Sequence, residues 1–125
     1  MSQLSGEILP QPLVDDYEFG YIVIGGKGYR HDVIITPTRV VADWWRLEGH
    51  RLQIPDVRDY MAEDVEAVVI GTGYDGLMRV DPEVVEEFRK RGVEVYIAKT
   101  REAVEIYNDL VRRGKKVLAF LHLTC

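Results

Sequence analysis

The segment Val65-Glu66-Ala67-Val68-Val69-Ile70-Gly71-Thr72-Gly73 decides the fold class of this chain. Its first six residues are almost continuously apolar and β-branched, which is typical of a strand covered on both faces. The glycines that follow allow a sharp turn off the end of that strand. We therefore expect a buried strand over residues 65–70, with helices on both sides of its sheet.

The rest of the second half alternates between helices and strands. Asp81 and Pro82 provide an N-cap and a first helical residue, Thr100 provides a second cap, and glycines stop both helices. The expected elements are a helix from Asp81 to Gly92, a strand over 93–98, a helix from Thr100 to Arg113 and a strand over 117–121. This β-α-β-α-β order leaves connections long enough for right-handed crossovers between parallel strands.

The first half has the pattern of antiparallel strands. Two apolar runs, residues 21–24 and 33–35, flank a glycine-rich turn and predict a β-hairpin. A third strand is expected over residues 39–46, and Asp56 is a possible cap for a short helix. The whole pattern predicts a single three-layer α/β domain over residues 17–125, whose mixed β-sheet joins an N-terminal antiparallel hairpin to the β-α-β-α-β portion. Residues 1–16 show no period and are expected to form an N-terminal arm.

Composition narrows the class of protein. The 125 residues include 16 Lys and Arg against 21 Asp and Glu, a net charge of −5, which argues against nucleic-acid binding. No apolar run is long enough for membrane insertion, and the N-terminus lacks the pattern of a signal peptide, so we expect a cytoplasmic protein. The single cysteine, Cys125, excludes an intrachain disulfide. One Asn among abundant Arg and Glu hints at a thermophile.

The run from Gly71 to Gly76 matches the dinucleotide-binding pattern G-x-G-x-x-G. Two features count against it, because the next helix begins only at Asp81 and Lys99 stands where an acidic residue is expected. We read the glycines chiefly as a turn off a buried strand. No Walker motif or serine elbow is present, and the histidine spacing does not suggest a metal site. We therefore expect no cofactor, metal or catalytic residue.

One edge of the expected sheet still gathers polar groups. If the last three strands are parallel, their carboxyl ends meet there, and open α/β sheets bind ligands at such edges. An ordinary turn and a solvated first-turn arginine are the alternatives. The candidate ligand-binding residues are Gly71, Thr72, Gly73, Thr100, Arg101 and His122.

The adjacent pair Trp44-Trp45 is the other unusual feature. Neighbouring residues on a strand face opposite sides, so one indole is expected to be exposed. Exposed Trp with Arg46 and His50 is typical of a protein interface, although burial under the N-terminal arm is an alternative. Trp44, Trp45, Arg46 and His50 are therefore candidate interface residues.

An ordered set of short motifs resembles one known family. The motifs are Tyr29-Arg30-His31-Asp32-Val33-Ile34-Ile35, Trp44-Trp45 with Gly49-His50, Ile70-Gly71-Thr72-Gly73, Thr100 with Ala103, Tyr107-Asn108 and Gly114, and Leu121-His122-Leu123-Thr124-Cys125. Their order and spacing resemble the Mth938-like domain family (DUF498) over residues 19–125. The resemblance implies a three-layer domain with a mixed sheet and no established reaction, cofactor or catalytic residue.

Eukaryotic members of that family include a mitochondrial complex I assembly factor and an adipogenesis-associated protein. The resemblance therefore favours a non-enzymatic module that binds an unknown protein partner or helps assembly. The alternative is a small anionic-ligand or cofactor binder, conceivably an enzyme, that uses the Gly71-Thr72-Gly73 loop. A homo-oligomer formed through an edge strand of the hairpin is a further possibility.

Overall fold

Strand β10 (Val117–His122) lies at the centre of a five-stranded sheet in the computed structural model, which describes residues 9–125. It runs parallel to β7 (Ala67–Thr72) and antiparallel to β4 (Val33–Ile35). Strand β9 (Glu94–Ala98) extends the sheet in parallel beyond β7, and β5 (Val40–Val41) extends it beyond β4. The α/β class and the parallel direction of the last three strands are thereby confirmed.

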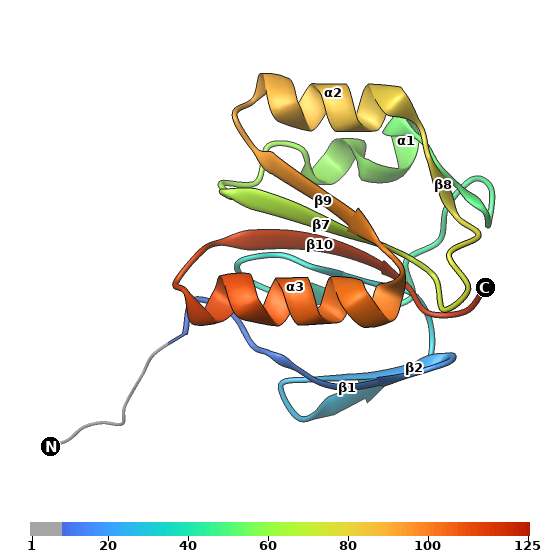
Figure 1. Ribbon diagram of the computed structural model, residues 1–125, viewed down its shortest axis with the longest axis vertical. Helices are drawn as coiled ribbons and strands as arrows, with labels where there is room; N and C mark the ends of the chain where they lie inside the picture. Colours follow the sequence, from blue (N-terminus) through green and yellow to red (C-terminus); the bar gives the residue numbers. More distant parts are fainter. Residues whose placement is uncertain (1–8) are drawn as a thin grey trace, which may run out of the picture.

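The central strands supply apolar side chains to both faces of the sheet. Along β10, Leu118 and Phe120 enter one core, whereas Val117, Ala119 and Leu121 enter the other. Helix α3 (Thr100–Arg112) covers one face, and α1 (Ile54–Val57) and α2 (Pro82–Lys90) cover the opposite face (Figure 1). The continuous apolar runs in the sequence are therefore explained by burial on two sides.

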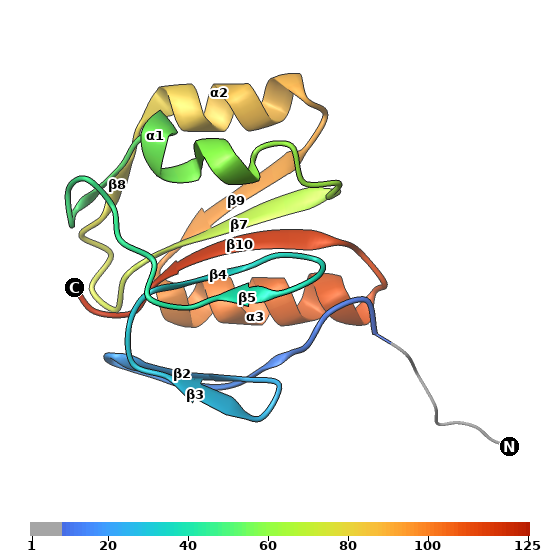
Figure 2. The same ribbon diagram turned by 180° about the vertical axis from the view of Figure 1, so that it is seen from behind.

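A separate three-stranded sheet packs on the same core as α3 (Figure 2). It consists of β1 (Val14–Glu18), β2 (Tyr21–Ile24) and β3 (Lys27–Tyr29). The hairpin turns at Gly25 and Gly26, whose φ angles are 55° and 83°, and β3 follows at once. The predicted pairing of residues 21–24 with 33–35 is wrong, because a two-glycine turn leaves residues 27–29 to complete the hairpin.

The segment expected to be an arm contributes to the folded structure from residue 9 onward. Strand β1 begins at Val14, so the expected boundary between residues 16 and 17 falls inside it. Gln11 is buried, and its amide accepts from Val117 N at 2.5 Å and donates to the oxygens of Val117 and Thr36 at 2.7 and 3.2 Å. Residues 1–8 of the predicted arm lie outside the described residues.

The connection between β5 and β7 differs most from the sequence pattern. The predicted strand over residues 39–46 ends at Val41, because Asp43 adopts a φ of 55° that no strand accommodates. The two tryptophans therefore lie in a loop. Helix α1 starts at Ile54, and Asp56 is its third residue rather than its cap. A 3₁₀ turn, Arg58–Tyr60, follows, and a short parallel pair joins β6 (Arg51–Leu52) to β8 (Arg79–Val80).

The two longer helices follow their sequence signals closely. Asp81 is the N-cap of α2, as predicted, and Pro82 is its first residue. The cap of α3 is Lys99 rather than Thr100, which is the first helical residue. Within residues 9–125, no helix has both the length and the apolar character that crossing a membrane requires.

Replacing Gln11 with Ala tests whether the N-terminal segment holds the sheet together. The variant leaves the Val117 amide and carbonyl without their partner, so we expect the free energy of unfolding to fall by about 3 kcal/mol. Chemical denaturation measures this change. The control is Gln53→Ala, which removes one exposed hydrogen bond to Glu48 and is expected to cost under about 1 kcal/mol. Equal effects of the two variants would contradict this role.

Candidate functional site

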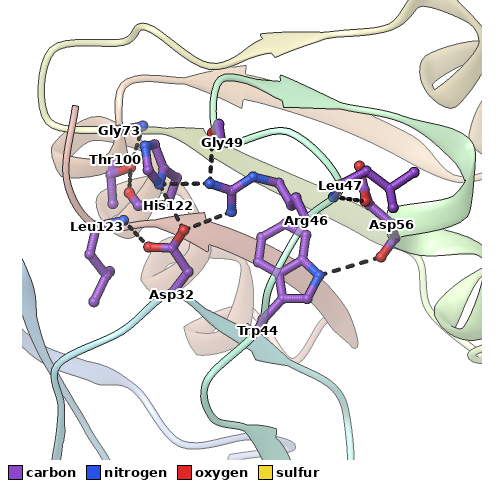
Figure 3. Close-up of polar contacts among 10 residues, drawn as sticks. All are labelled: Asp32, Trp44, Arg46, Leu47, Gly49, Asp56, Gly73, Thr100, His122 and Leu123. Atoms are coloured by element: carbon purple, nitrogen blue, oxygen red, sulfur yellow. Dashed lines mark hydrogen bonds and ion pairs between the residues drawn. The ribbon is translucent and has the colours of Figure 1, made fainter.

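Asp32 and His122 meet because β4 and β10 are antiparallel neighbours. Val33 pairs with Leu121, so the residue before β4 lies beside the last residue of β10. Asp32 Oδ2 is 2.7 Å from His122 Nδ1, and Asp32 Oδ1 accepts a hydrogen bond from Leu123 N at 2.7 Å (Figure 3). The pairing of the strands thus fixes both side chains at one end of the sheet.

Arg46 enters the same cluster from the loop that follows β5. Its Nη1 donates to Asp32 Oδ2 at 2.7 Å and its Nη2 donates to the carbonyl oxygen of Gly49 at 2.7 Å (Figure 3). The guanidinium also lies over the ring of Trp44, 4.9 Å from its centre. Only 4% of the Arg46 side chain is exposed, so this ion pair is largely screened from water.

The geometry fixes which nitrogen of His122 carries a proton. An ionised Asp32 can only accept, so the short contact places a proton on His122 Nδ1. Arg46 Nη2 lies 3.1 Å from Nδ1 but cannot donate a hydrogen bond to it, because the protonated Nδ1 has no free lone pair. His122 Nε2 and Arg46 Nε are buried and have no hydrogen-bond partner among residues 9–125.

The surroundings of Asp32 keep it ionised. Burial raises the pKa of its carboxyl, but hydrogen bonds from His122, Leu123 N and Arg46 outweigh burial and bring the pKa below its usual value. The result is a buried carboxylate with two side-chain neighbours, the cationic Arg46 and the polar His122. Charged groups in such clusters depend on one another, because removing one leaves another without compensation.

A pocket of about 430 Å³ opens beside this cluster. Asp32, Arg46 and His122 lie on its polar side, and both tryptophans contribute to its walls. Three further basic or titratable residues line it: Arg30, His31 and His50. Two ring contacts lie along the pocket, a tilted one between His31 and Trp45 with centres 5.6 Å apart and an edge-on one between His50 and His122 with centres 6.2 Å apart.

The pocket brings together residues that the sequence placed in two separate groups. All four candidate interface residues line it, together with His122 from the candidate ligand group. Trp44 is buried against Phe120, whereas 75% of Trp45 is exposed. One exposed indole was expected, although a loop rather than strand alternation produces it.

Asp32 was not among the candidates, and neither was Arg30 or His31. Asp32 does carry a sequence signal, because it is a charged residue directly before the buried run of residues 33–35. The role of Asp32 follows only once this run is known to pair with the last strand. The predicted hairpin paired it with residues 21–24 instead.

The glycine loop after β7 is occupied by contacts within the chain. Gly73 N donates to Thr100 Oγ1 at 2.8 Å, and that hydroxyl donates to the His122 carbonyl at 2.6 Å. Thr72 Oγ1 likewise donates to the Ala98 carbonyl at 3.1 Å. A Cβ at Gly71 would lie 2.8 Å from Thr100 Oγ1, so the helix is packed directly against the strand end.

The last two residues of the chain cover the same loop. Tyr74 N donates to the Thr124 carbonyl at 2.7 Å, and Leu77 N donates to the Cys125 carbonyl at 2.9 Å. Arg101 turns away, over the rings of Tyr17 and Tyr74. Of the six candidate ligand residues, His122 alone lines the pocket. Within the described chain, no three His, Cys, Asp or Glu side chains are grouped to hold a metal ion.

Fold and site together define a three-layer α/β domain with a buried Asp-His-Arg cluster at one end of its sheet. Residues 14–122 match the model of the family described as "Protein of unknown function (DUF498/DUF598)". The chain belongs to this family, and the resemblance noted from its motifs is confirmed.

Solved structures share the fold. The conserved hypothetical protein PH1505 from Pyrococcus horikoshii OT3 is 28% identical, with a TM-score of 0.74 over 90% of this chain and 98% of that one. A Bordetella pertussis protein described as a Mth938-like domain is 20% identical, with a TM-score of 0.71 over 98% and 92%. An outer membrane protein from Bartonella henselae is 21% identical, with a TM-score of 0.75 over 94% and 100%.

Gly73→Ala tests how tightly the glycine loop is closed. Gly73 has a φ of 109°, and a Cβ there would overlap the backbone of Cys125, so we expect a loss of about 3 kcal/mol in unfolding free energy. Gly92→Ala is the matched control, because its φ is also positive, at 78°, but nothing lies within 4 Å of its Cβ position. The control should lose only about 1 kcal/mol in thermal or chemical unfolding. A similar loss in both would show that backbone strain alone matters.

Asp32→Asn tests the ion-pair cluster through pH. Because the folded pKa lies below the usual value of 3.8, the ionised carboxylate stabilises the fold above that value, and the contribution disappears as pH falls through the folded pKa. We expect the variant to be about 3 kcal/mol less stable above about pH 5, with a difference that shrinks in stronger acid. Denaturation curves across pH measure it. A difference independent of pH would contradict the role of the charge.

Proposed function

We propose that this protein is a non-enzymatic protein-binding module and that residues 44–47, the tryptophan loop, contact its partner. The observation that carries the proposal is the exposure of two large apolar side chains in this short loop. Trp45 is 75% exposed and Leu47 is 70% exposed. Exposed Trp is the residue type most enriched where protein interfaces gain their affinity.

The tryptophan loop is held in one conformation before any partner arrives. Arg46 is bound by Asp32 and Gly49, and Leu47 N donates to Asp56 Oδ1 at 2.9 Å. Trp44 anchors the loop in the core beside Phe120. A fixed loop loses little conformational entropy on binding, so more of the contact energy contributes to affinity.

A shallow hollow next to the loop indicates which partner chemistry fits. It encloses about 450 Å³, and its lining includes Trp45, Leu47, Pro55, Asp59 and Tyr60. Apolar and aromatic surfaces therefore lie beside an exposed carboxylate, on a chain of net charge −5. The complementary partner is a protein segment that carries an apolar side chain next to a Lys or Arg.

The family resemblance supports the same role, because the family includes an assembly factor and has no established reaction. The single cysteine is in keeping with a reducing compartment, and we place the binding activity in the cytoplasm.

A displayed library of random short peptides tests this surface without a known partner. We expect selection to enrich sequences that combine Lys or Arg with Leu, Phe or Trp. Trp45→Ala should weaken the binding of selected peptides by about tenfold or more, with little change in melting temperature, because the indole is exposed.

Ile97→Ala is the control, since Ile97 is an exposed apolar residue on edge strand β9, away from the tryptophan loop. It should leave peptide binding unchanged. Selection of peptides without basic residues, or equal binding by the Trp45→Ala variant, would overturn the proposal.

A further inference from the structure

Beyond the protein-binding surface, we propose that the pocket beside Asp32, Arg46 and His122 binds a small organic anion. Its carboxylate or phosphate group would meet His122 Nε2, and its flat apolar part would lie against the indole of Trp45. This places an anion site next to the closed glycine loop rather than in it.

The first argument is a pair of buried nitrogens that lack a hydrogen-bond partner. His122 is 6% exposed at its side chain and Arg46 is 4% exposed, yet His122 Nε2 and Arg46 Nε have no partner within residues 9–125. A buried polar atom without a partner costs about 1–3 kcal/mol. With its proton on Nδ1, the His122 ring presents a lone pair at Nε2. An acidic ligand that brings a proton to this atom would then accept a hydrogen bond back from it, which would recover that cost at the ring nitrogen that Asp32 leaves free.

Charge is the second argument. Arg30 and Arg46 line the pocket against a single carboxylate, Asp32, so the pocket carries a positive charge within an acidic protein. A concave surface of one charge sign attracts small ions of the opposite sign.

Size and shape supply the third argument. The volume of about 430 Å³ suits a small organic molecule, since ligand pockets span roughly 300–1,000 Å³. Trp45 and His31 form an aromatic wall, with their rings tilted by 44° and the ring centres 5.6 Å apart. Aromatic faces bind planar groups well, so a ring joined to an anionic head uses both the wall and the polar side.

His50 is the pocket residue whose ring packs against the ring of His122. It is exposed, lines the pocket and packs edge-on against the His122 ring, with centres 6.2 Å apart. Exposed side chains change rotamer within picoseconds to nanoseconds, so rotation of His50 admits a ligand without movement of the sheet.

An NMR-detected titration of the folded protein with three probes tests the proposal. Benzoate joins a ring to a carboxylate, inorganic phosphate is an anion without a ring, and benzyl alcohol is a ring without charge. We expect saturable shifts of the Asp32, Arg46 and Leu123 amides with benzoate, weaker binding of phosphate, and none of benzyl alcohol. Benzyl alcohol binding as tightly as benzoate would overturn the proposal.

Variants separate the parts of the site. His122→Phe should weaken benzoate binding about tenfold or more, because it keeps a ring at this position but removes both nitrogens and with them the hydrogen bond to the anion. Since His122 is buried, two exposed positions provide tests that do not risk the fold: Trp45→Ala should weaken benzoate but not phosphate, and Arg30→Gln should weaken both. Arg101→Gln, outside the pocket, should change neither.

The outcome is distinguishable from that of the protein-binding proposal. Arg30→Gln should weaken benzoate binding and leave the selected basic peptides bound as before. If benzoate binds equally to the His122, Arg30 and Trp45 variants, the anion site is not in this pocket, whatever the peptides show.

Discussion

This end of the molecule depends on the hydrogen bonds that the carboxylate of Asp32 accepts. Its two oxygens accept hydrogen bonds from two separate segments: the end of β10 with the residue beyond it, and the tryptophan loop. These segments come from the C-terminal end of the chain and from its middle. One buried anion therefore fixes the position of the loop, the tautomer of His122 and the polar side of the pocket at once.

The elements that could be predicted from sequence are those whose burial pattern is local. The apolar runs that became β7 and β10, and the amphipathic stretches that became α2 and α3, carry their own start and stop signals. The pairing of β4 carries no such signal, because its three residues are buried and suit any neighbouring strand. The role of Gln11 could not be predicted either, because it depends on hydrogen bonds to backbone groups far away in the sequence.

The site, too, could be predicted only in part. The unusual tryptophan pair singled out Trp44 and Trp45 with their neighbours Arg46 and His50, and the expected strand ends singled out His122. All five residues line one pocket. Their grouping could not be predicted, because it follows from the antiparallel neighbour of β10 and from the turn at Asp43. The glycines after β7 form the turn that the sequence chiefly indicated. What the sequence could not show is which group they approach: glycine allows close approach of any group, and here the group is the chain's own terminal backbone.

Leu123 joins the two sheets through its backbone. Its amide donates to Asp32, while its carbonyl accepts from Gly20 N at 3.0 Å and from the hydroxyl of Tyr17 at 2.9 Å. The amide proton of Gly20 exchanges with solvent each time this contact between the small sheet and the end of β10 opens. Its exchange rate is therefore a direct gauge of how often the two sheets come apart beside the pocket.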